Sequence, residues 1–454
     1  MSDGPDLVVA GAGGGLAGAL RAAELGLSVL VVEASEHFRR GNNTSMSTAM
    51  FPGAGSRWQA SAGVADSPEQ FVADIMAKTK GQADPRLART LASVSAPLVE
   101  WLADSAGLPL SLVTDFNYPG HAVTRCHSIP GRHGSGVIDH LARRVTEHEN
   151  IELLVPGKLI DVLSDSGGVR AVVVRYPDGT EEEIPTRAVL LATNGFGADK
   201  DLVARHLPEI AGALYQGSDQ SLGDALRIGE KLGAATGFLD AYQGHGAVAA
   251  NAGTLVGWAT VIHGAFLVDL GGRRFGDETR GYSEYAAELA AREGSTGWIV
   301  LDETIFEQCQ PFQDFKDTVA SGALVWADDA AGLAAVTGLP AEALADELSR
   351  VAAIARGERP DEFGRTNWER PLSGRYAAVR VVPALFHTQG GLMVDENAAV
   401  VDASGQRIPG LYAAGGAAAS ISGHGAAGYL PGNGLLPAFG LAYLAASDVA
   451  RRHH

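Results

Sequence analysis

Short apolar runs and a glycine-rich turn open the chain and predict a βαβ unit. Residues 7–10 are all apolar, a run too short for a helix and typical of a buried strand. The glycine run 11–15 follows, and apolar residues then recur at three- and four-residue spacing over 16–27, which predicts a helix. Residues 27–32 form a second apolar run that ends at Glu33. The pattern therefore predicts strand, tight turn, helix and strand.

Helical and strand patterns alternate farther along and change character near residue 241. The predicted helices lie at 67–104 in two parts divided at Asp84, at 339–357 and at 437–450, and the predicted strands at 151–155, 159–163, 169–175, 188–192, 265–269, 298–301 and 410–416. The Rossmann-like texture of the first part returns at residue 387. The fold class is therefore predicted as α/β with an α+β cap. Residues 1–240 and 385–454 would form one Rossmann-like domain, and 241–384 a capping domain inserted into it.

Composition narrows the class of protein. The 454 residues are 46% hydrophobic and 19% charged, as in globular enzymes, and the net charge of −18 disfavours nucleic acid and anionic membrane surfaces as partners. Cys126 and Cys309 are the two cysteines, so neither a disulfide framework nor a thiolate metal site is expected, and we predict no metal. Because no apolar run is long enough to cross a bilayer and the first strand begins at residue 7, we predict no membrane span and a cytoplasmic location.

The glycine turn and Glu33 carry the first candidate chemistry. In such a unit the glycines let backbone approach a pyrophosphate, and an acid about 20 residues on binds ribose hydroxyls. Here Leu16 stands at the third glycine place, with Gly18 nearby. The predicted cofactor contacts, including later strand ends and the start of the last helix, are Gly11, Gly13, Gly14, Gly15, Leu16, Glu33, Ala34, Asn42, Asn43, Thr44, Ser45, Thr193, Asn194, Gly195, Gly415, Gly416, Leu435 and Leu436.

Several segments in a fixed order point to a family. Together, the glycine turn with Glu33 and residues 192–196, 272–278, 387–391 and 410–415 resemble the fumarate reductase/succinate dehydrogenase flavoprotein superfamily. The resemblance implies an FAD-binding domain with a capping domain that closes over the isoalloxazine ring. The hydroxyl-rich stretch 41–56 has no histidine where the membrane-complex members attach flavin, so the FAD is expected to be non-covalent.

The substrate positions differ from those of the fumarate enzymes. Tyr282 and Tyr429 occupy the places of two family arginines, and Gly257-Trp258 that of a threonine-glutamate pair. These exchanges resemble the 3-ketosteroid dehydrogenase branch, in which a tyrosine takes a proton and a tyrosine and a glycine hold the ketone oxygen. The chain is short for a steroid enzyme, and a desaturase of a smaller cyclic ketone, such as 4-oxocyclohexanecarboxylate, fits better.

The resemblance implies a role for each candidate catalytic residue. Tyr282 would take the proton from the α-carbon while the β-hydrogen leaves as hydride to flavin N5. Tyr429, with backbone N–H groups of the glycine segment 432–434 (Gly432 and Gly434), would polarise the ketone. A tyrosine base needs a lowered pKa, for which Arg280 or Tyr118 is the candidate.

Further side chains are assigned to substrate binding. His245 and His387 would hydrogen-bond a substrate oxygen, and Trp258 and Phe116 would form an apolar wall. Basic residues between 121 and 133 would form either an edge that holds carboxylates or a solvated loop.

Three alternatives stay open. The first is reduction of an α,β-unsaturated acid, as in fumarate reductases, and the second is dehydrogenation of a 3-ketosteroid. A non-catalytic flavin subunit that relays electrons is a different class, disfavoured by the absence of haem and iron–sulfur motifs. The substrate partner is a small molecule, and oxygen, a quinone or a carrier protein is the electron acceptor.

Overall fold

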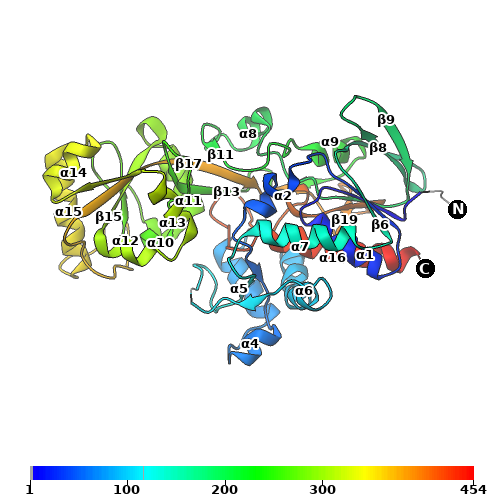
Figure 1. The fold of residues 1–454 in the computed structure, drawn as a ribbon, viewed down its shortest axis with the longest axis horizontal. Helices are drawn as coiled ribbons and strands as arrows, with labels where there is room; N and C mark the ends of the chain where they lie inside the picture. The colour runs from blue at the N-terminus through cyan, green and yellow to red at the C-terminus, as the bar shows by residue number, and fades with distance from the viewer. Residues whose placement is uncertain (1–3, 116, 454) are drawn as a thin grey trace. The chain divides into compact units, whose positions relative to one another are not determined.

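The computed structural model describes residues 4–115 and 117–453, which form two compact units (Figure 1). Unit 1 falls in the ranges Met1–Leu207, Gly217–Tyr242 and His387–His454, and unit 2 in Pro208–Gln216 and Gln243–Phe386. Residues 208–216 belong to unit 2, although the sequence placed them in the first part of the FAD-binding domain. The domain boundaries after 240 and 384 stay a prediction.

Unit 1 holds most of the strands and the longest helices. Its strands are β1 Leu7–Ala10, β2 Val29–Val32, β3 Phe51–Pro52, β4 Ser111–Leu112, β5 Cys126–Ser128, β6 Ile151–Leu154, β7 Lys158–Asp165, β8 Gly168–Arg175, β9 Glu181–Pro185, β10 Val189–Leu191, β12 Thr236–Gly237, β18 Gly391–Leu392, β19 Ala399–Val401 and β20 Arg407–Ala413. Its helices are α1 Gly15–Glu24, α2 Phe38–Gly41, α3 Asn43–Met46, α4 Arg57–Ser61, α5 Pro68–Lys78, α6 Pro85–Asp104, α7 Gly134–Thr146, α8 Lys200–His206, α9 Asp224–Lys231, α16 Leu435–His453 and the 3₁₀ turn η3 Gly415–Ala417.

A six-stranded sheet organises unit 1. Its strand order is β19-β20-β10-β1-β2-β6, and the pairs from β20 to β6 are all parallel. The residues of β1, β2 and β10 are fully buried, as expected for a sheet covered on both faces. The predicted βαβ unit is therefore confirmed, with the second strand beginning at Val29 and not at Leu27.

The first and last helices of unit 1 pack together against this sheet, and Figure 1 shows α1 in blue beside α16 in red. A Cβ on Gly14 would lie 2.4 Å from the carbonyl oxygen of Ala438. A Cβ on Gly18 would lie 3.0 Å from Leu190 and 3.2 Å from Ala442. Gly18 thus provides the close helix–sheet contact, while Leu16, at the third glycine place, is buried in the core.

Unit 2 is built on a second sheet, of order β11-β17-β15-β14, with β13 and β16 also paired to β17. Its strands are β11 Leu214–Tyr215, β13 Tyr242–Ala249, β14 Phe266–Val268, β15 Gly297–Asp302, β16 Leu324–Ala327 and β17 Tyr376–Thr388, the first residue of β13 and the last two of β17 lying in unit 1. Its helices are α10 Ala259–Ile262, α11 Tyr282–Ala290, α12 Glu303–Cys309, α13 Gln313–Ala320, α14 Ala330–Thr337, α15 Ala341–Ala355 and the 3₁₀ turns η1 Glu278–Arg280 and η2 Glu293–Ser295.

Among the described residues, the sequence patterns located five of the sixteen α-helices (α1, α5, α6, α15 and α16) and strands β1, β2, β6, β7, β8, β10, β14, β15 and β20. They missed the central strand of unit 2. β17 is thirteen residues long and pairs with four other strands, yet it contains Pro383, which is unusual inside a central strand. Helix α7 was also not predicted. Among the described residues, no helix is long and apolar enough to span a membrane.

Candidate functional site

The predicted cofactor residues of unit 1 lie at one edge of its sheet. Ala10 is in register with Val32 on one side and Leu191 on the other, and Leu191 is in register with Ala413. The glycine turn, Glu33, the 192–195 segment and the 414–416 segment therefore leave neighbouring parallel strands at the same level. The carboxyl edge of such a sheet is where open α/β folds bind ligands.

Glu33 is buried and bound to the glycine turn. Its carboxylate accepts the backbone N–H of Ala12 at 2.7 Å and that of Ser35 at 2.8 Å. Desolvation raises the pKa of Glu33, and these two N–H groups oppose that shift. One carboxylate thus links the end of β2 to the turn after β1, and its remaining lone pairs can accept ribose hydroxyls.

The 42–45 segment closes over the same turn. Asn42 donates from its amide nitrogen to the carbonyl oxygen of Ala12 at 3.2 Å and caps α3 by accepting the N–H of Ser45 at 2.8 Å. A Cβ on Gly13 would meet only the hydroxyl of Thr44, at 3.2 Å. Asn43 accepts the N–H of Ser218 at 2.7 Å. These contacts bring the predicted residues Asn42 and Thr44 to the glycine turn.

The segments after β10 and β20 meet by backbone contact. Asn194 has φ of 65°, and a Cβ on Gly416 would lie 2.5 Å from its side-chain oxygen and 2.7 Å from the backbone nitrogen of Gly195. Glycine is therefore required at 416 because any side chain would displace this loop. Thr193–Gly195 and Gly415–Gly416, predicted separately from the sequence, lie in contact.

Three buried polar atoms of the described part of unit 1 have no protein partner. Among the described residues of unit 1, they are Thr193 Oγ1, Ser420 Oγ and Asn433 Oδ1. Buried polar groups are normally hydrogen-bonded, so unsatisfied ones indicate a missing ligand or water. With the glycine turn and Glu33, they fit FAD: Glu33 would hold the ribose, and the turn and the first N–H groups of α16 would meet its electron-rich oxygens.

A second group of candidates gathers around Gly434. The rings of His387 and Tyr429 lie 5.9 Å apart at an interplanar angle of 73°. A Cβ on Gly434 would lie 3.1 Å from Nε2 of His387 and 3.9 Å from the Tyr429 hydroxyl oxygen. Because glycine has no side chain, both polar atoms face the space above its Cα. Desolvation lowers the pKa of His387 to about 4, so the ring is neutral at pH 7.

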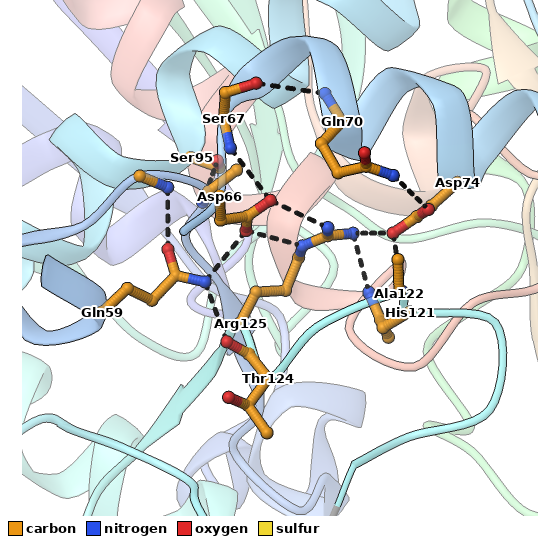
Figure 2. A network of polar contacts seen from close by, with 12 residues as sticks. Gln59, Asp66, Ser67, Gln70, Asp74, Ser95, His121, Ala122, Thr124 and Arg125 are labelled. Atoms are coloured by element: carbon orange, nitrogen blue, oxygen red, sulfur yellow. Dashed lines mark hydrogen bonds and ion pairs between the residues drawn. The ribbon is translucent and has the colours of Figure 1, made fainter. Parts of the chain in front are cut away.

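The segment that carries Tyr429 and Gly434 is fixed by a buried ion network, shown in Figure 2. Arg125 donates twice to Asp66, at 3.0 Å each, and once to Asp74 at 2.6 Å. Arg125 and Asp66 are fully buried, and the guanidinium also lies over the ring of Phe71. A buried cation with two carboxylates and this many hydrogen bonds has little freedom to move.

The network reaches the glycine segment through His121. Arg125 donates to Nδ1 of His121 at 3.2 Å, so the ring proton must lie on Nε2, which donates to the carbonyl oxygen of Pro431 at 2.9 Å. Desolvation, together with the nearby Arg125 charge, lowers the pKa of His121 to about 4. His121, Arg125 and His127 are buried, so the solvated-loop interpretation of this stretch is wrong for them. Arg125 does hold carboxylates, but they belong to the chain itself.

Unit 2 contributes an aromatic group around His245. The His245 ring stacks on Tyr282 at 4.9 Å and on Phe386 at 5.6 Å, and Trp258 approaches its edge at 5.7 Å. His245 Nδ1 accepts the N–H of Ala247 at 3.1 Å, and desolvation lowers its pKa to about 3. The ring is therefore neutral with its proton on Nε2.

Tyr282 owes its position to a second buried ion network. It is the first residue of α11, directly after Gly281, whose φ of 137° favours glycine. Four residues before Tyr282, Glu278 accepts from Arg274 at 2.8 Å and from Arg365 at 3.2 Å. The carbonyl oxygen of Glu278 also accepts the indole N–H of Trp258 at 3.2 Å. The sequence motif around Arg274 therefore anchors the turn before Tyr282.

The remaining candidates are placed as follows. Tyr118 packs against Met50, Val113 and Cys126 and lies near Arg132. Arg280 pairs with Glu288 at 3.8 Å. Phe116 lies outside the described residues.

The sequence reading missed several residues that hold the candidates in place. Asp66, Asp74, Arg365 and Ser422 belong to no motif. Gln389 and Asn433 lie in the segments 387–391 and 432–434, but the sequence assigned them no role. Only the spatial pairing shows what they contact.

Comparison with known proteins agrees with this geometry. A family model described as "FAD binding domain" matches residues 6–435. The chain is 29% identical over 453 residues to "Fumarate reductase (cytochrome)" of Shewanella frigidimarina, covering 98% of this chain and 77% of the relative.

Two solved structures have the same fold. An open flavocytochrome c3 fumarate reductase superposes with a TM-score of 0.82 at 25% identity, covering 98% of this chain and 78% of that one. A 3-ketosteroid Δ1-dehydrogenase from Sterolibacterium denitrificans, in complex with 1,4-androstadiene-3,17-dione, superposes with a TM-score of 0.81 at 21% identity, covering 99% of each chain.

The fold and site define a flavoprotein oxidoreductase with a Rossmann-like cofactor domain. The chain belongs to the FAD-binding family of the fumarate reductase/succinate dehydrogenase flavoprotein superfamily, and it is an FAD-dependent enzyme. The predicted superfamily, fold class and cofactor are confirmed. Which site residues touch cofactor or substrate stays a prediction.

We predict that the purified protein is yellow and that Glu33→Ala weakens its hold on FAD. The substitution removes the carboxylate that would bind the ribose, and it frees the Ala12 N–H of the glycine turn. Dialysis followed by measurement of the flavin-to-protein absorbance ratio should show lower retention, with an unchanged circular dichroism spectrum. Glu36→Ala, at an exposed position three residues on, is the matched control. Flavin that stays with acid-precipitated protein would contradict non-covalent binding.

We predict that Arg125→Met destabilises the protein, because it leaves two buried carboxylates without their cation. The free energy of unfolding in urea should fall by about 3–5 kcal/mol, as for other broken buried pairs. Arg132→Met, which breaks the partly exposed pair with Asp115, should cost less than about 1 kcal/mol. Equal effects of the two substitutions would mean that the Arg125 network contributes no more than a surface pair.

Proposed function

We propose that this enzyme desaturates a small cyclic ketone, such as an oxocyclohexane carboxylate, between its α- and β-carbons. The observation that carries the proposal is that the candidate substrate-facing groups are uncharged donors. His245 and His387 are neutral at pH 7 because desolvation lowers their pKa values to about 3 and about 4. Neutral N–H and O–H donors suit a carbonyl oxygen, whereas a dicarboxylate favours cationic partners.

In this proposal each tyrosine has one role. Tyr282 takes the α-proton on its phenolate oxygen, and Tyr429 donates its hydroxyl proton in a hydrogen bond to the carbonyl oxygen, where negative charge develops. FAD, when bound, supplies the acceptor for the β-hydrogen, which leaves with its electron pair as the C=C bond forms. Oxygen, a quinone or a carrier protein would then take those two electrons.

The local structure supports Tyr282 as the base. It begins α11, and the positive end of a helix dipole stabilises a negative charge on a first-turn side chain. The stacked His245 ring and the edge of Trp258 hold the phenol in one orientation. Arg280, two residues earlier, is half-exposed and paired with Glu288, so its charge is shared. Tyr118 remains the second candidate for lowering the pKa of the base.

Reduction of an α,β-unsaturated acid is the second candidate function. The similarity to the Shewanella frigidimarina fumarate reductase, which extends over 98% of this chain, favours it as much as the fold favours a ketone enzyme. Against it stand tyrosines at the two arginine places that the family resemblance assigns to fumarate. A 3-ketosteroid substrate is a larger variant of the first proposal. The compartment, predicted as cytoplasmic, stays a prediction.

We predict that cyclic ketones bleach the oxidised flavin of this enzyme. Anaerobic mixing with a panel that includes 4-oxocyclohexanecarboxylate and a 3-ketosteroid should reduce the flavin absorbance for at least one saturated ketone. The parallel experiment offers fumarate to dithionite-reduced protein and follows reoxidation. Reoxidation by fumarate with no bleaching by any ketone would overturn the desaturase proposal in favour of the reductase.

We predict that substitutions of the two tyrosines change the pH dependence of flavin reduction differently. Tyr282→Phe keeps the ring but removes the proton acceptor, so flavin reduction by ketone should fall roughly 10²–10⁴-fold. Tyr429→Phe removes one oxyanion donor and should cost on the order of 10²–10³-fold. The wild-type rate should rise with pH as Tyr282 ionises. Tyr429→Phe should keep that rise, and Tyr282→Phe should flatten it. A wild-type rate and pH profile in Tyr282→Phe would make this tyrosine a packing residue.

A further inference from the structure

A chain of polar side chains in unit 1 ends on His387. Asn433 donates from its amide nitrogen to the Ser422 hydroxyl at 3.1 Å, and Ser422 donates to the side-chain oxygen of Gln389 at 2.8 Å. The Gln389 amide nitrogen then donates to Nδ1 of His387 at 2.8 Å. Asn433, Ser422 and Gln389 are each at most 3% exposed. Every donor along this chain points toward the histidine.

The direction of this chain determines which ring nitrogen carries the proton. Nδ1 accepts from Gln389 and is therefore unprotonated, which leaves the proton of the neutral ring on Nε2. Nε2 is the nitrogen that lies toward Gly434, and the Tyr429 hydroxyl approaches the same glycine. A 3.4 Å approach of Nδ1 to the carbonyl oxygen of Thr388 would favour the opposite tautomer, but it is much longer than the Gln389 contact.

The contacts around His387 come from a tyrosine ring, glycine backbone, a carbonyl and one side-chain amide. Among the described residues, the groups in contact with the ring include the titratable Tyr429 ring, Gly434, the Thr388 carbonyl and the Gln389 amide. The Gln389 amide makes the shorter of the two contacts with Nδ1. Reversing the Gln389 amide would require Ser422 and Asn433 to reverse as well. The far end of the chain, Asn433 Oδ1, is one of the buried atoms without a protein partner.

We propose that Gln389, held by Ser422 and Asn433, is a positioning residue that keeps His387 in the Nε2–H form, so that the histidine serves as a hydrogen-bond donor beside Tyr429. The consequence for catalysis rests on the proposed function: two neutral donors, the His387 Nε2–H and the Tyr429 hydroxyl, would then share one substrate oxygen. The tautomer itself does not depend on which substrate the enzyme uses.

The test reads the tautomer directly in the FAD-loaded protein. With ¹⁵N-histidine labelling, long-range ¹H–¹⁵N spectra distinguish a protonated from an unprotonated ring nitrogen, and His387→Gln identifies the signals of this residue. The wild type should show a protonated Nε2 and an unprotonated Nδ1 from pH 6 to 8. A proton on Nδ1 in the wild type would overturn the proposal.

Two variants at Gln389 test its role. Gln389→Glu replaces the donor by an acceptor, so His387 should gain a proton on Nδ1 and its pKa should rise by at least about 1 unit. Gln389→Met removes the donor at similar length, and the proton should distribute over both nitrogens. Gln406→Glu, also in unit 1, adds the same charge away from His387 and should leave its signals unchanged. Wild-type His387 signals in both Gln389 variants would overturn the proposal.

The rate of flavin reduction by ketone separates this proposal from the proposed function. Gln389→Met should lower that rate by about 10-fold or more while FAD retention stays at the wild-type level. If no ketone bleaches the flavin but the nitrogen signals respond as expected, the desaturase proposal fails and the role of Gln389 stands. If ketones bleach the flavin and the signals do not respond, the reverse holds.

Discussion

The close approach of the glycine turn to the last helix is the constraint on which unit 1 depends. Gly14 lies against the backbone of Ala438, so no side chain fits there without moving α1 or α16. The same contact brings residues separated by more than 400 positions to one edge of the sheet. Glu33, Thr193 and Gly416 leave neighbouring strands at the level that this packing defines. The predicted cofactor residues lie near one another because the backbone of the glycine turn packs directly on the backbone of α16.

The candidate reacting groups share one electrostatic design. The charged groups contact the segments that carry these residues. Arg125 is hydrogen-bonded to His121, which donates to the carbonyl oxygen of Pro431. Glu278, paired with Arg274, holds the turn before Tyr282. The groups that would meet substrate are neutral, because burial removes the charge of both histidines at pH 7. Buried ions give rigidity, and neutral donors give hydrogen bonds without attracting anions. This separation distinguishes the arrangement from an arginine-based carboxylate clamp.

The sequence predicted the features that depend on residues close together in the chain. The βαβ unit is visible because its strands, turn and acid lie within 33 residues, and the superfamily follows from motifs in fixed order. The partners of Arg125 could not be predicted, since Asp66 and Asp74 lie on a loop and a helix that carry no motif. Likewise, Gln389 and Asn433 are linked through hydrogen bonds to Ser422 only after residues 389–433 have folded back on themselves. β17 was not predicted because Pro383 lies within it, and proline is rarely found inside a central strand.

The packing of α16 beneath the glycine turn also bears on how the protein is made. During synthesis the glycine turn at residues 11–15 leaves the ribosome before Ala438. The turn therefore lacks its contact with α16 until Ala438 has been made. The 3₁₀ turn η3, which holds Gly415 and Gly416, is likewise made late. A nascent chain therefore lacks part of this nucleotide-binding edge until α16 has been made. We therefore expect complete FAD binding only after α16 has packed against the glycine turn.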